Sequence, residues 1–437
     1  MTRLKGFDLF ALGFMTFALF LGAGNIIFPA NVGMAAGEHL WRAALGFLLT
    51  GVGLPLLTVV ALARVGGGMP SLTAPLGRLV GSALAVTVYL AIGPLFATPR
   101  TAVVSFEIGI APFVGNSAAA LFAYTAAYFA VVLFLVLKPG RLLDRVGKAI
   151  TPVLLLALLL LGAAALFAPA GPIGVSAVEY QEQPLLKGFL NGYLTMDALG
   201  ALVFGIVIAT AIRDRGVTAP YLVTRYSIIA VIIAGIGLAL VYLSLFYLGA
   251  TSQQIAGSAA NGGQILTAYV QHTFGGYGLV LLAMVITLAC LTTGVGLLAA
   301  CGEFFSELLR VPYRVVVWVF ALFSLLVSNQ GLAQLLRVSE PVLVGLYPLA
   351  IALVALGLMD RLWRSSARVF RPVMAITLLF GLADGLLAAG FDTLVPAFYA
   401  QLPWAKYGLG WLSPVLVMLL LAALADRLLP VQARTAD

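Results

Sequence analysis

Long apolar segments separated by short polar turns follow one another along the whole chain. A helix that crosses the hydrocarbon core of a membrane needs about 20 mostly apolar residues, and the chain offers roughly twelve such segments. The pattern predicts an all-α polytopic membrane protein. The expected spans are 9–36, 41–63, 82–107, 118–138, 149–168, 189–212, 222–249, 277–301, 313–328, 333–358, 372–390 and 409–429.

Two of these spans contain residues that interrupt a helix. The first includes FLGAGNIIFPAN, in which Gly22 and Gly24 weaken the helix and Pro29 removes a backbone donor. The sixth includes NGYLTMDALGALVFG, where glycines surround the lone acid Asp197. Backbone freed inside a membrane cannot face lipid, so it must line a cavity enclosed by protein. We therefore predict unwound backbone near residues 22–25 and 196–205, with the two breaks crossing near the membrane centre.

Interrupted helices in corresponding positions indicate a transporter built from inverted repeats, although glycines in membranes also serve close helix packing. Spans one and six correspond if the first ten helices form two five-helix halves. The expected division is 1–168 for the first repeat, 169–188 for an extracellular connection, 189–360 for the second repeat, and 361–437 for helices 11 and 12 with a cytoplasmic tail. The connection 250–276 has no Lys, Arg, Asp or Glu and is expected to be partly helical or re-entrant.

Composition agrees with this pattern. Of the 437 residues, 62% are hydrophobic and 9% are charged. A soluble fold would lack the polar surface that water requires, so we expect the lipid bilayer to surround much of the chain. The net charge of +8 does not indicate a nucleic-acid partner, because the basic residues cluster at the ends of apolar segments.

The positions of the basic residues predict the topology. All Lys and Arg residues fall in alternate turns, with the exception of Arg42, Arg100, Lys187, Arg337 and Lys406. Cytoplasmic turns of membrane proteins carry an excess of positive charge, so this bias places both termini in the cytoplasm.

Several kinds of chemistry have no support in the sequence. Neither His39 nor His272 has a second ligand at metal-binding spacing, and the chain contains no phosphate-binding loop or nucleophile elbow. Cys290 and Cys301 fall in one predicted helix, too far apart for a disulfide. A membrane-embedded enzyme would need a catalytic cluster and a channel would need a polar stripe. We expect neither, and we expect no cofactor and no obligate protein partner.

Long strings in the sequence point to a family. They are GFMTFALFLGAGNIIFPANVGMAAG, GFLLTGVGLPLLTVVALA, YLAIGPLFATPRTAVVSFEIGIAP, GYLTMDALGALVFGIVIATAI and LACLTTGVGLLAACGEFF. Together they closely resemble the branched-chain amino acid:cation symporter family, the BrnQ-type carriers. The resemblance implies the five-plus-five inverted-repeat fold of the leucine-transporter type, with discontinuous helices 1 and 6 and two additional C-terminal helices. It also implies import of leucine, isoleucine or valine with sodium through a bacterial cell (inner) membrane.

A branched-chain amino acid is a zwitterion with an aliphatic side chain. Its site needs donors for the carboxylate, acceptors for the ammonium group and an apolar pocket. The outer half-helix that begins near Gly24 and Asn25 is expected to point free N–H groups at the carboxylate. The substrate-binding candidates lie beside the interruptions, and three of them, Phe96, Met196 and Phe204, are expected to wall the aliphatic pocket. The full set is Gly22, Ala23, Gly24, Asn25, Phe96, Met196, Asp197 and Phe204.

Sodium is a hard cation that prefers oxygen ligands. The motif LACLTTG resembles the eighth-helix sodium motif of the leucine-transporter type, which places Thr292 and Thr293 on ligand hydroxyls. Hydrogen bonding to the preceding helical turn is the alternative for these two residues. Asn25 falls on the asparagine that serves a second sodium site in some members of that fold. The candidate sodium ligands are Ala18, Leu21, Asn25, Ala289, Thr292 and Thr293.

Charged residues inside a membrane are functional candidates. Asp197 is expected to coordinate an ion, contact the substrate ammonium or cap a broken half-helix. Arg100 and Asp384 are further intramembrane charges to which the sequence assigns no role. Arg337 and Glu340 are expected to pair along one helix face.

The sequence thus predicts a sodium-coupled secondary symporter that imports branched-chain amino acids by alternating access. A proton-coupled amino acid carrier that uses Asp197 is the alternative.

Overall fold

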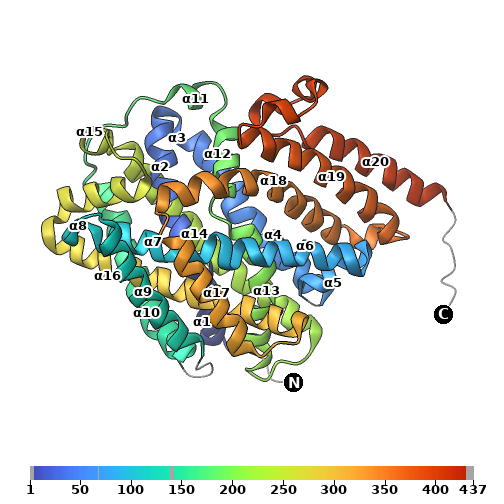
Figure 1. Ribbon diagram of the computed structural model, residues 1–437, viewed down its shortest axis with the longest axis horizontal. Helices are drawn as coiled ribbons and strands as arrows, with labels where there is room; N and C mark the ends of the chain where they lie inside the picture. Colours follow the sequence, from blue (N-terminus) through green and yellow to red (C-terminus); the bar gives the residue numbers. More distant parts are fainter. Residues whose placement is uncertain (1–3, 67, 138–141, 430–437) are drawn as a thin grey trace.

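The computed structural model describes residues 4–66, 68–137 and 142–429, with the backbone alone over 142–154. Within these residues every regular element is a helix. The helices form one bundle, and Figure 1 shows the last two long helices, α19 (Ser366–Ala388) and α20 (Leu412–Leu428), at one side of it. Arg3, Lys138, Arg141 and Arg434, which belong to the predicted cytoplasmic turns, lie outside the described residues.

The first half of the chain forms a bundle of interrupted and continuous helices. Its longer helices are α1 (Gly6–Phe20), α2 (Ala23–Ala36), α3 (Leu40–Leu48), α4 (Leu54–Val65), α6 (Arg78–Leu90), α7 (Ala97–Gly109), α9 (Ala118–Val136) and α10 (Leu142–Phe167). Short helices α5 (Met69–Thr73) and α8 (Ala111–Val114) lie in connections. Two π-helical turns, Leu49–Gly53 and Ala91–Leu95, join α3 to α4 and α6 to α7.

The second half repeats this arrangement of a broken helix followed by longer ones. Its helices are α12 (Pro184–Tyr193), α13 (Asp197–Arg213), α14 (Pro220–Ala250), α16 (Gly262–Leu309), α17 (Tyr313–Ser328) and α18 (Leu332–Leu358). Short helices α11 (Val178–Gln181) and α15 (Gln253–Ala256) precede α12 and α16. Between α19 and α20 the chain forms 3-10 turns at Asp392–Leu394, Ala397–Gln401 and Ala405–Tyr407.

Seven helical segments among the described residues are long and apolar enough to cross a membrane, or eight if the bent pair α12–α13 is one span. One of the seven, Ala23–Val65, covers parts of two predicted spans, and it includes Gly37, which has a positive φ of 47°. Shorter apolar helices lie at Gly6–Phe20, Leu155–Phe167 and Tyr313–Ser328. The polytopic helical fold is confirmed, and the expected number of spans stays a prediction.

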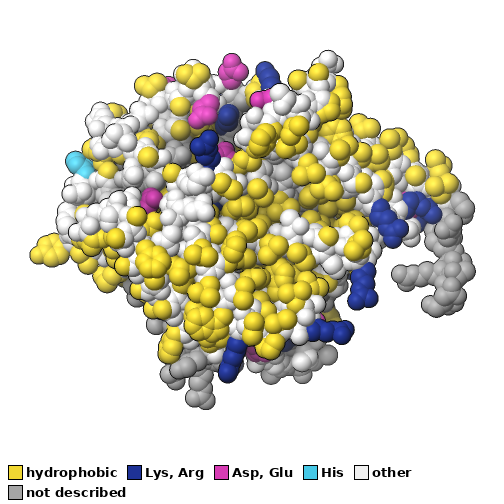
Figure 2. Space-filling view, in the orientation of Figure 1, with side chains coloured by type: hydrophobic (Ala, Val, Ile, Leu, Met, Phe, Trp, Pro, Cys, Tyr) yellow, Lys and Arg dark blue, Asp and Glu magenta, His cyan; other side chains and the backbone are white. Residues whose placement is uncertain are grey.

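The molecular surface is largely apolar. Figure 2 shows hydrophobic side chains over the broad middle of one face, with charged side chains gathered toward its edges. On α19 and α20, Leu379 and Leu420 are 62% and 66% exposed. Apolar surface of this extent suits lipid as the surrounding medium.

The first predicted interruption separates α1 from α2. Leu21 leaves the helical conformation with φ −70° and ψ 83°, and Gly22 is extended with φ −103° and ψ −171°. The Gly22 N–H turns back to donate to the Phe20 carbonyl at 2.7 Å. The break is therefore confirmed at Leu21 and Gly22, whereas Gly24 and Asn25 already belong to the first turn of α2.

The second interruption connects α12 to α13 through residues 194–196, with a bend of 43° between the two helices. Met196 adopts a left-handed conformation with φ 65°, which is uncommon for a residue other than glycine. The predicted unwinding over residues 196–205 is wrong beyond Met196, because α13 is helical from Asp197 onward. Gly205 serves packing instead, since a Cβ there would lie 2.4 Å from Leu62 Cδ1 on α4.

Close backbone contact fixes the outer half-helix α12. A Cβ on Gly46 would lie 1.9 Å from the Leu185 carbonyl oxygen, and one on Gly188 would lie 2.0 Å from the Ala43 carbonyl oxygen. Helices α3 and α12 therefore touch backbone to backbone at two levels. This contact positions the end of α12 beside the first break.

The connection 250–276 is partly helical, which is one of its two predicted alternatives. It contains α15 and the first part of α16, which turns at Gly275 with φ 62° and ψ −154°. The Asn261 side chain accepts from the Gln264 N–H at 3.1 Å and so caps the start of α16.

Two expectations about charged residues change. Arg337 and Glu340 are both exposed, and no ion pair joins them, so the expected pairing is wrong. Asp384 has a partner that lies on another element: its carboxylate accepts from the Trp411 N–H at 3.2 Å, at the start of α20. Cys290 and Cys301 are both free and buried, as expected.

Candidate functional site

A cavity of about 40 Å³ lies where the two helix breaks meet. At roughly 10–15 Å³ per molecule, it has room for about three water molecules. A larger ligand therefore requires the lining to move. The lining residues come from α1, α2, α7, α13, α16 and the turns beside them: Leu19, Phe20, Gly22, Ala23, Gly24, Asn25, Ile92, Ala97, Arg100, Thr101, Thr195, Met196, Asp197, Gly200, Phe204, Thr293 and Leu297.

The first break brings two helix ends of opposite polarity to this cavity. The C-terminal end of α1 leaves carbonyl groups without intrahelical partners, and the N-terminal end of α2 leaves N–H groups without them. The α2 end borders the cavity through Ala23 and Gly24. The Asn25 side-chain oxygen accepts from the Gly22 N–H at 3.2 Å and holds this end in place. The break thus offers acceptors on one side and donors on the other.

A polar cluster at the cavity joins three helices. The Asn25 side-chain amide on α2 donates to an Asp197 oxygen at 2.6 Å and makes a second hydrogen bond to the Tyr242 hydroxyl on α14. The Tyr242 hydroxyl donates to the same Asp197 oxygen at 2.8 Å. Asp197 is only 5% exposed and is the first residue of α13, where the positive end of the helix dipole favours a carboxylate. All three predicted roles of Asp197 remain compatible with this position.

Arg100 on α7 also borders the cavity, and it is 2% exposed. Its guanidinium donates to the Leu194 carbonyl at 2.7 Å and to the Ser339 hydroxyl at 2.9 Å. The guanidinium carbon lies 5.4 Å from the centre of the Phe28 ring. Arg100 therefore connects the end of α12 to α18 and α2.

The candidate sodium ligands fall into two groups. The Thr293 hydroxyl on α16 donates to the Leu21 carbonyl at 3.3 Å, so α16 touches the first break directly. Thr292 instead donates to the Ala289 carbonyl of its own helix at 2.8 Å. Thr293 lines the cavity, whereas Ala18, Leu21, Ala289 and Thr292 do not.

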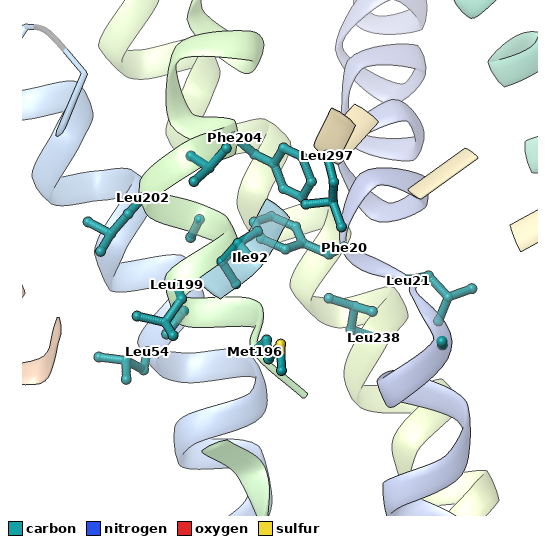
Figure 3. Close-up of a cluster of buried hydrophobic side chains, with 14 of the residues drawn as sticks. Phe20, Leu21, Leu54, Ile92, Met196, Leu199, Leu202, Phe204, Leu238 and Leu297 are labelled. Atoms are coloured by element: carbon teal, nitrogen blue, oxygen red, sulfur yellow. The ribbon is translucent and has the colours of Figure 1, made fainter. Parts of the chain in front are cut away.

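One side of the cavity is apolar. Figure 3 shows Phe20, Ile92, Phe204 and Leu297 close together beside the second break, with Met196 near them. The rings of Phe20 and Phe204 meet edge to face, with their centres 6.0 Å apart. Phe96, the third predicted wall residue, is buried but does not line this cavity.

Sequence reasoning missed several residues of the site. Phe20 directly precedes the first break and could have been chosen by the rule that selected Met196. Ile92 and Leu297 resemble any other apolar residue of a membrane helix, and no signal singles them out. Tyr242 is a tyrosine inside a long apolar helix, and only its hydrogen bonds to Asp197 and Asn25 assign it to the cluster.

Comparison with known proteins assigns this chain to a family. Residues 5–429 match the family model described as branched-chain amino acid transport protein. The branched-chain amino acid transport system 2 carrier protein of Pseudomonas aeruginosa is 72% identical over 429 residues, which are 98% of each chain. The branched-chain amino acid permease BrnQ of Escherichia coli is 54% identical over 425 residues, or 97% of each chain. BraB of Bacillus subtilis, also called a branched-chain amino acid permease, is 42% identical over 415 residues, covering 94% of this chain and 93% of that one.

Solved structures share the fold at low sequence identity. A nucleobase-cation-symport-1 family transporter, MHP1, in a closed conformation matches with a TM-score of 0.59 and 15% identity, over 96% of this chain and 92% of that one. A manganese transporter of Eremococcus coleocola matches with a TM-score of 0.54 and 12% identity, over 98% of this chain and 97% of that one. These likenesses and the two broken helices show the leucine-transporter-type fold. By its sequence, the chain belongs to the branched-chain amino acid transport protein family.

Proposed function

We propose that this protein is a secondary symporter that imports leucine, isoleucine or valine together with sodium. The names of its relatives support the transport of branched-chain amino acids. The coupling ion is our own inference from the site. The observation that carries it is the meeting of the Leu21 carbonyl and the Thr293 hydroxyl across the first break.

A sodium ion between α1 and α16 would be held by neutral oxygen atoms. The end of α1 carries the negative end of a helix dipole, and its last carbonyls have no helical partners. The Thr293 hydroxyl adds an oxygen from the neighbouring helix. Sodium prefers such hard ligands, and carbonyls of a broken helix are a common cation site in transporters. Carbonyls near Ala18 and Ala289, with the Thr292 hydroxyl, would complete the coordination, and Asn25 would serve a second ion if one binds.

The amino acid would occupy the cavity beside this ion. Its carboxylate would face the N–H groups of Ala23 and Gly24, and its side chain would lie against the apolar wall formed by Phe20, Phe204 and Leu297. Cation and substrate would then bind at opposite ends of one break. Alternating access would follow when the helices around both breaks move together. Each elementary charge that enters through about 100 mV would add roughly 2.3 kcal/mol to accumulation.

A proton-coupled carrier is the second candidate, and one observation favours it. Asp197 is a buried carboxylate at the cavity, held by neutral donors, and none of the described basic side chains pairs with it. A carboxylate in this position could exchange a proton between the two sides of the membrane.

Uptake of labelled leucine into proteoliposomes separates the two candidates. We expect an inward sodium gradient at equal pH to drive accumulation, and a sodium ionophore to abolish it. Accumulation driven by an inward proton gradient in sodium-free buffer, and abolished by a protonophore, would instead support coupling through Asp197.

A further inference from the structure

Arg100 is a buried cation whose charge no described acidic side chain balances. It is 2% exposed, and its two hydrogen-bond acceptors, the Leu194 carbonyl and the Ser339 hydroxyl, are both neutral. Its Nε–H is buried, and no group among the described residues accepts from it. Asp197, the acid that lines the same cavity, already accepts from Asn25 and Tyr242. A buried charge without a partner is costly, so this site favours binding of an anion.

The C-terminal end of α12 balances only part of the Arg100 charge. Leu194 is the C-terminal cap of α12, and the C-terminal end of a helix carries roughly half an elementary negative charge. The Arg100 guanidinium therefore keeps net positive charge at the border of the cavity. Its unused N–H group and its planar shape suit a carboxylate, which binds such a group through two oxygens.

The N-terminus of α2 lies beside the same carbonyl. A Cβ on Gly24 would lie 3.4 Å from the Leu194 oxygen and 3.3 Å from the Phe28 ring. The Arg100 guanidinium contacts both of these groups. Free N–H groups of α2 and the guanidinium thus approach one small region from two sides, and both attract negative charge.

We propose that Arg100 is a substrate-binding residue, and that the carboxylate of the transported amino acid is its missing counter-ion. This inference rests on the proposed function. The carboxylate lies between the α2 N-terminus and the guanidinium and accepts hydrogen bonds from both. The substrate ammonium group is then directed away from Arg100, toward the Asp197 cluster. Ligands without a carboxylate are rejected because they leave the guanidinium unpaired.

Competition against labelled leucine on the purified full-length protein tests this pairing. The competitors are unlabelled leucine and leucinamide, which keeps the ammonium group and the side chain but has no carboxylate. In the wild type, leucine should bind more tightly. In Arg100→Gln, leucine affinity should fall about 10- to 100-fold, the range expected for a charge-assisted hydrogen bond, while leucinamide affinity changes little. Arg337→Gln, a matched change at an exposed arginine, should preserve the wild-type ratio of the two affinities.

The ratio of affinities distinguishes binding from a structural role. If Arg100 only caps α12, Arg100→Gln lowers the affinities for leucine and leucinamide by the same factor, and the proposal fails. If Arg100→Gln does not fold, Arg100→Lys decides, because lysine keeps the charge but not the planar fork. In Arg100→Lys, the ratio of leucine affinity to leucinamide affinity should fall below that of the wild type. An unchanged ratio overturns the proposal. Wild-type protein that does not bind leucine would contradict the proposed function instead.

Discussion

The two helix breaks both bring helix ends to one cavity, and they differ in their charges. At the first break, between α1 and α2, the polar groups are backbone amides, the Asn25 amide and the Thr293 hydroxyl. At the second break, Arg100 binds the C-terminal end of α12, and Asp197 begins α13. Each of these charges is opposite in sign to the helix end that it meets, so each interaction is favourable. The second break therefore carries fixed charges of its own, whereas the first leaves its dipole ends free for ligands.

Removal of the fixed acid at the second break should have the largest effect. Asp197→Ala leaves the Asn25 amide and the Tyr242 hydroxyl without their shared acceptor, at a cost of about 1–3 kcal/mol for each unpaired group. We expect the apparent melting temperature of the purified protein to fall and sodium-driven leucine uptake to be lost. The matched control is Asp384→Ala, whose carboxylate lies at the start of α20, away from the cavity. It should lower the melting temperature but keep uptake per folded molecule. Wild-type uptake in Asp197→Ala would show that the cluster is dispensable.

The apolar wall of the cavity should set selectivity. At about 0.8 kcal/mol per buried methylene, the three carbons that leucine has beyond alanine contribute roughly 2 kcal/mol, or about thirtyfold in affinity. Valine should fall between the two, and lysine or glutamate should be excluded because the pocket would have to desolvate an unpaired charge. Competition of these amino acids against labelled leucine uptake measures the order. Equal competition by alanine would mean that the pocket is wider or wetter than Phe20, Phe204 and Leu297 suggest.

Adjacent threonines allow a sharper test of the first break. Thr293→Val removes the hydroxyl that meets the Leu21 carbonyl, and it should lower apparent sodium affinity about tenfold, as expected for one lost ligand worth about 1.4 kcal/mol. Thr292→Val removes a hydroxyl bonded to its own helix and should have a smaller effect. The measurement is leucine uptake as a function of sodium concentration. A larger effect for Thr292→Val would place the cation on the other side of α16.

The smallest effect on uptake should come from adding one methyl group to a glycine beside each break. A Cβ on Gly22 would lie 3.2 Å from Thr293 Cγ2, so Gly22→Ala should move the Thr293 side chain and with it the hydroxyl. The sodium concentration for half-maximal uptake should then rise about threefold, or roughly 0.7 kcal/mol. Gly200→Ala, in the first turn of α13 after the second break, meets only the Phe204 ring, at 3.6 Å, and should leave the sodium dependence unchanged. Equal effects of the two changes would mean that Gly22 only packs helices.

The sequence predicted the first break to within a few residues. Gly22, one of the two glycines that suggested it, lies at the break in an extended conformation. It extended the second break too far, because Gly200 and Gly205 suggested unwinding but lie inside α13, and the break ends at Met196 in a left-handed conformation. The roles of Arg100 and Asp384 could not be predicted from the sequence, since their partners, Leu194 and Trp411, are backbone groups of other elements. Family resemblance predicted the fold class. The contacts that link Asp197 to Tyr242 required the three-dimensional arrangement.

In the proposed function, a cation and an amino acid bind at opposite ends of the first break. We expect two ligands at one break to influence each other's affinity, and any such influence is reciprocal. The most direct test measures the Kd of leucine for the purified protein over a range of sodium concentrations, with choline added to keep ionic strength constant. We predict that leucine affinity rises with sodium in the wild type and that Thr293→Val needs more sodium for the same rise. Equal leucine affinity in sodium and in choline would contradict the account.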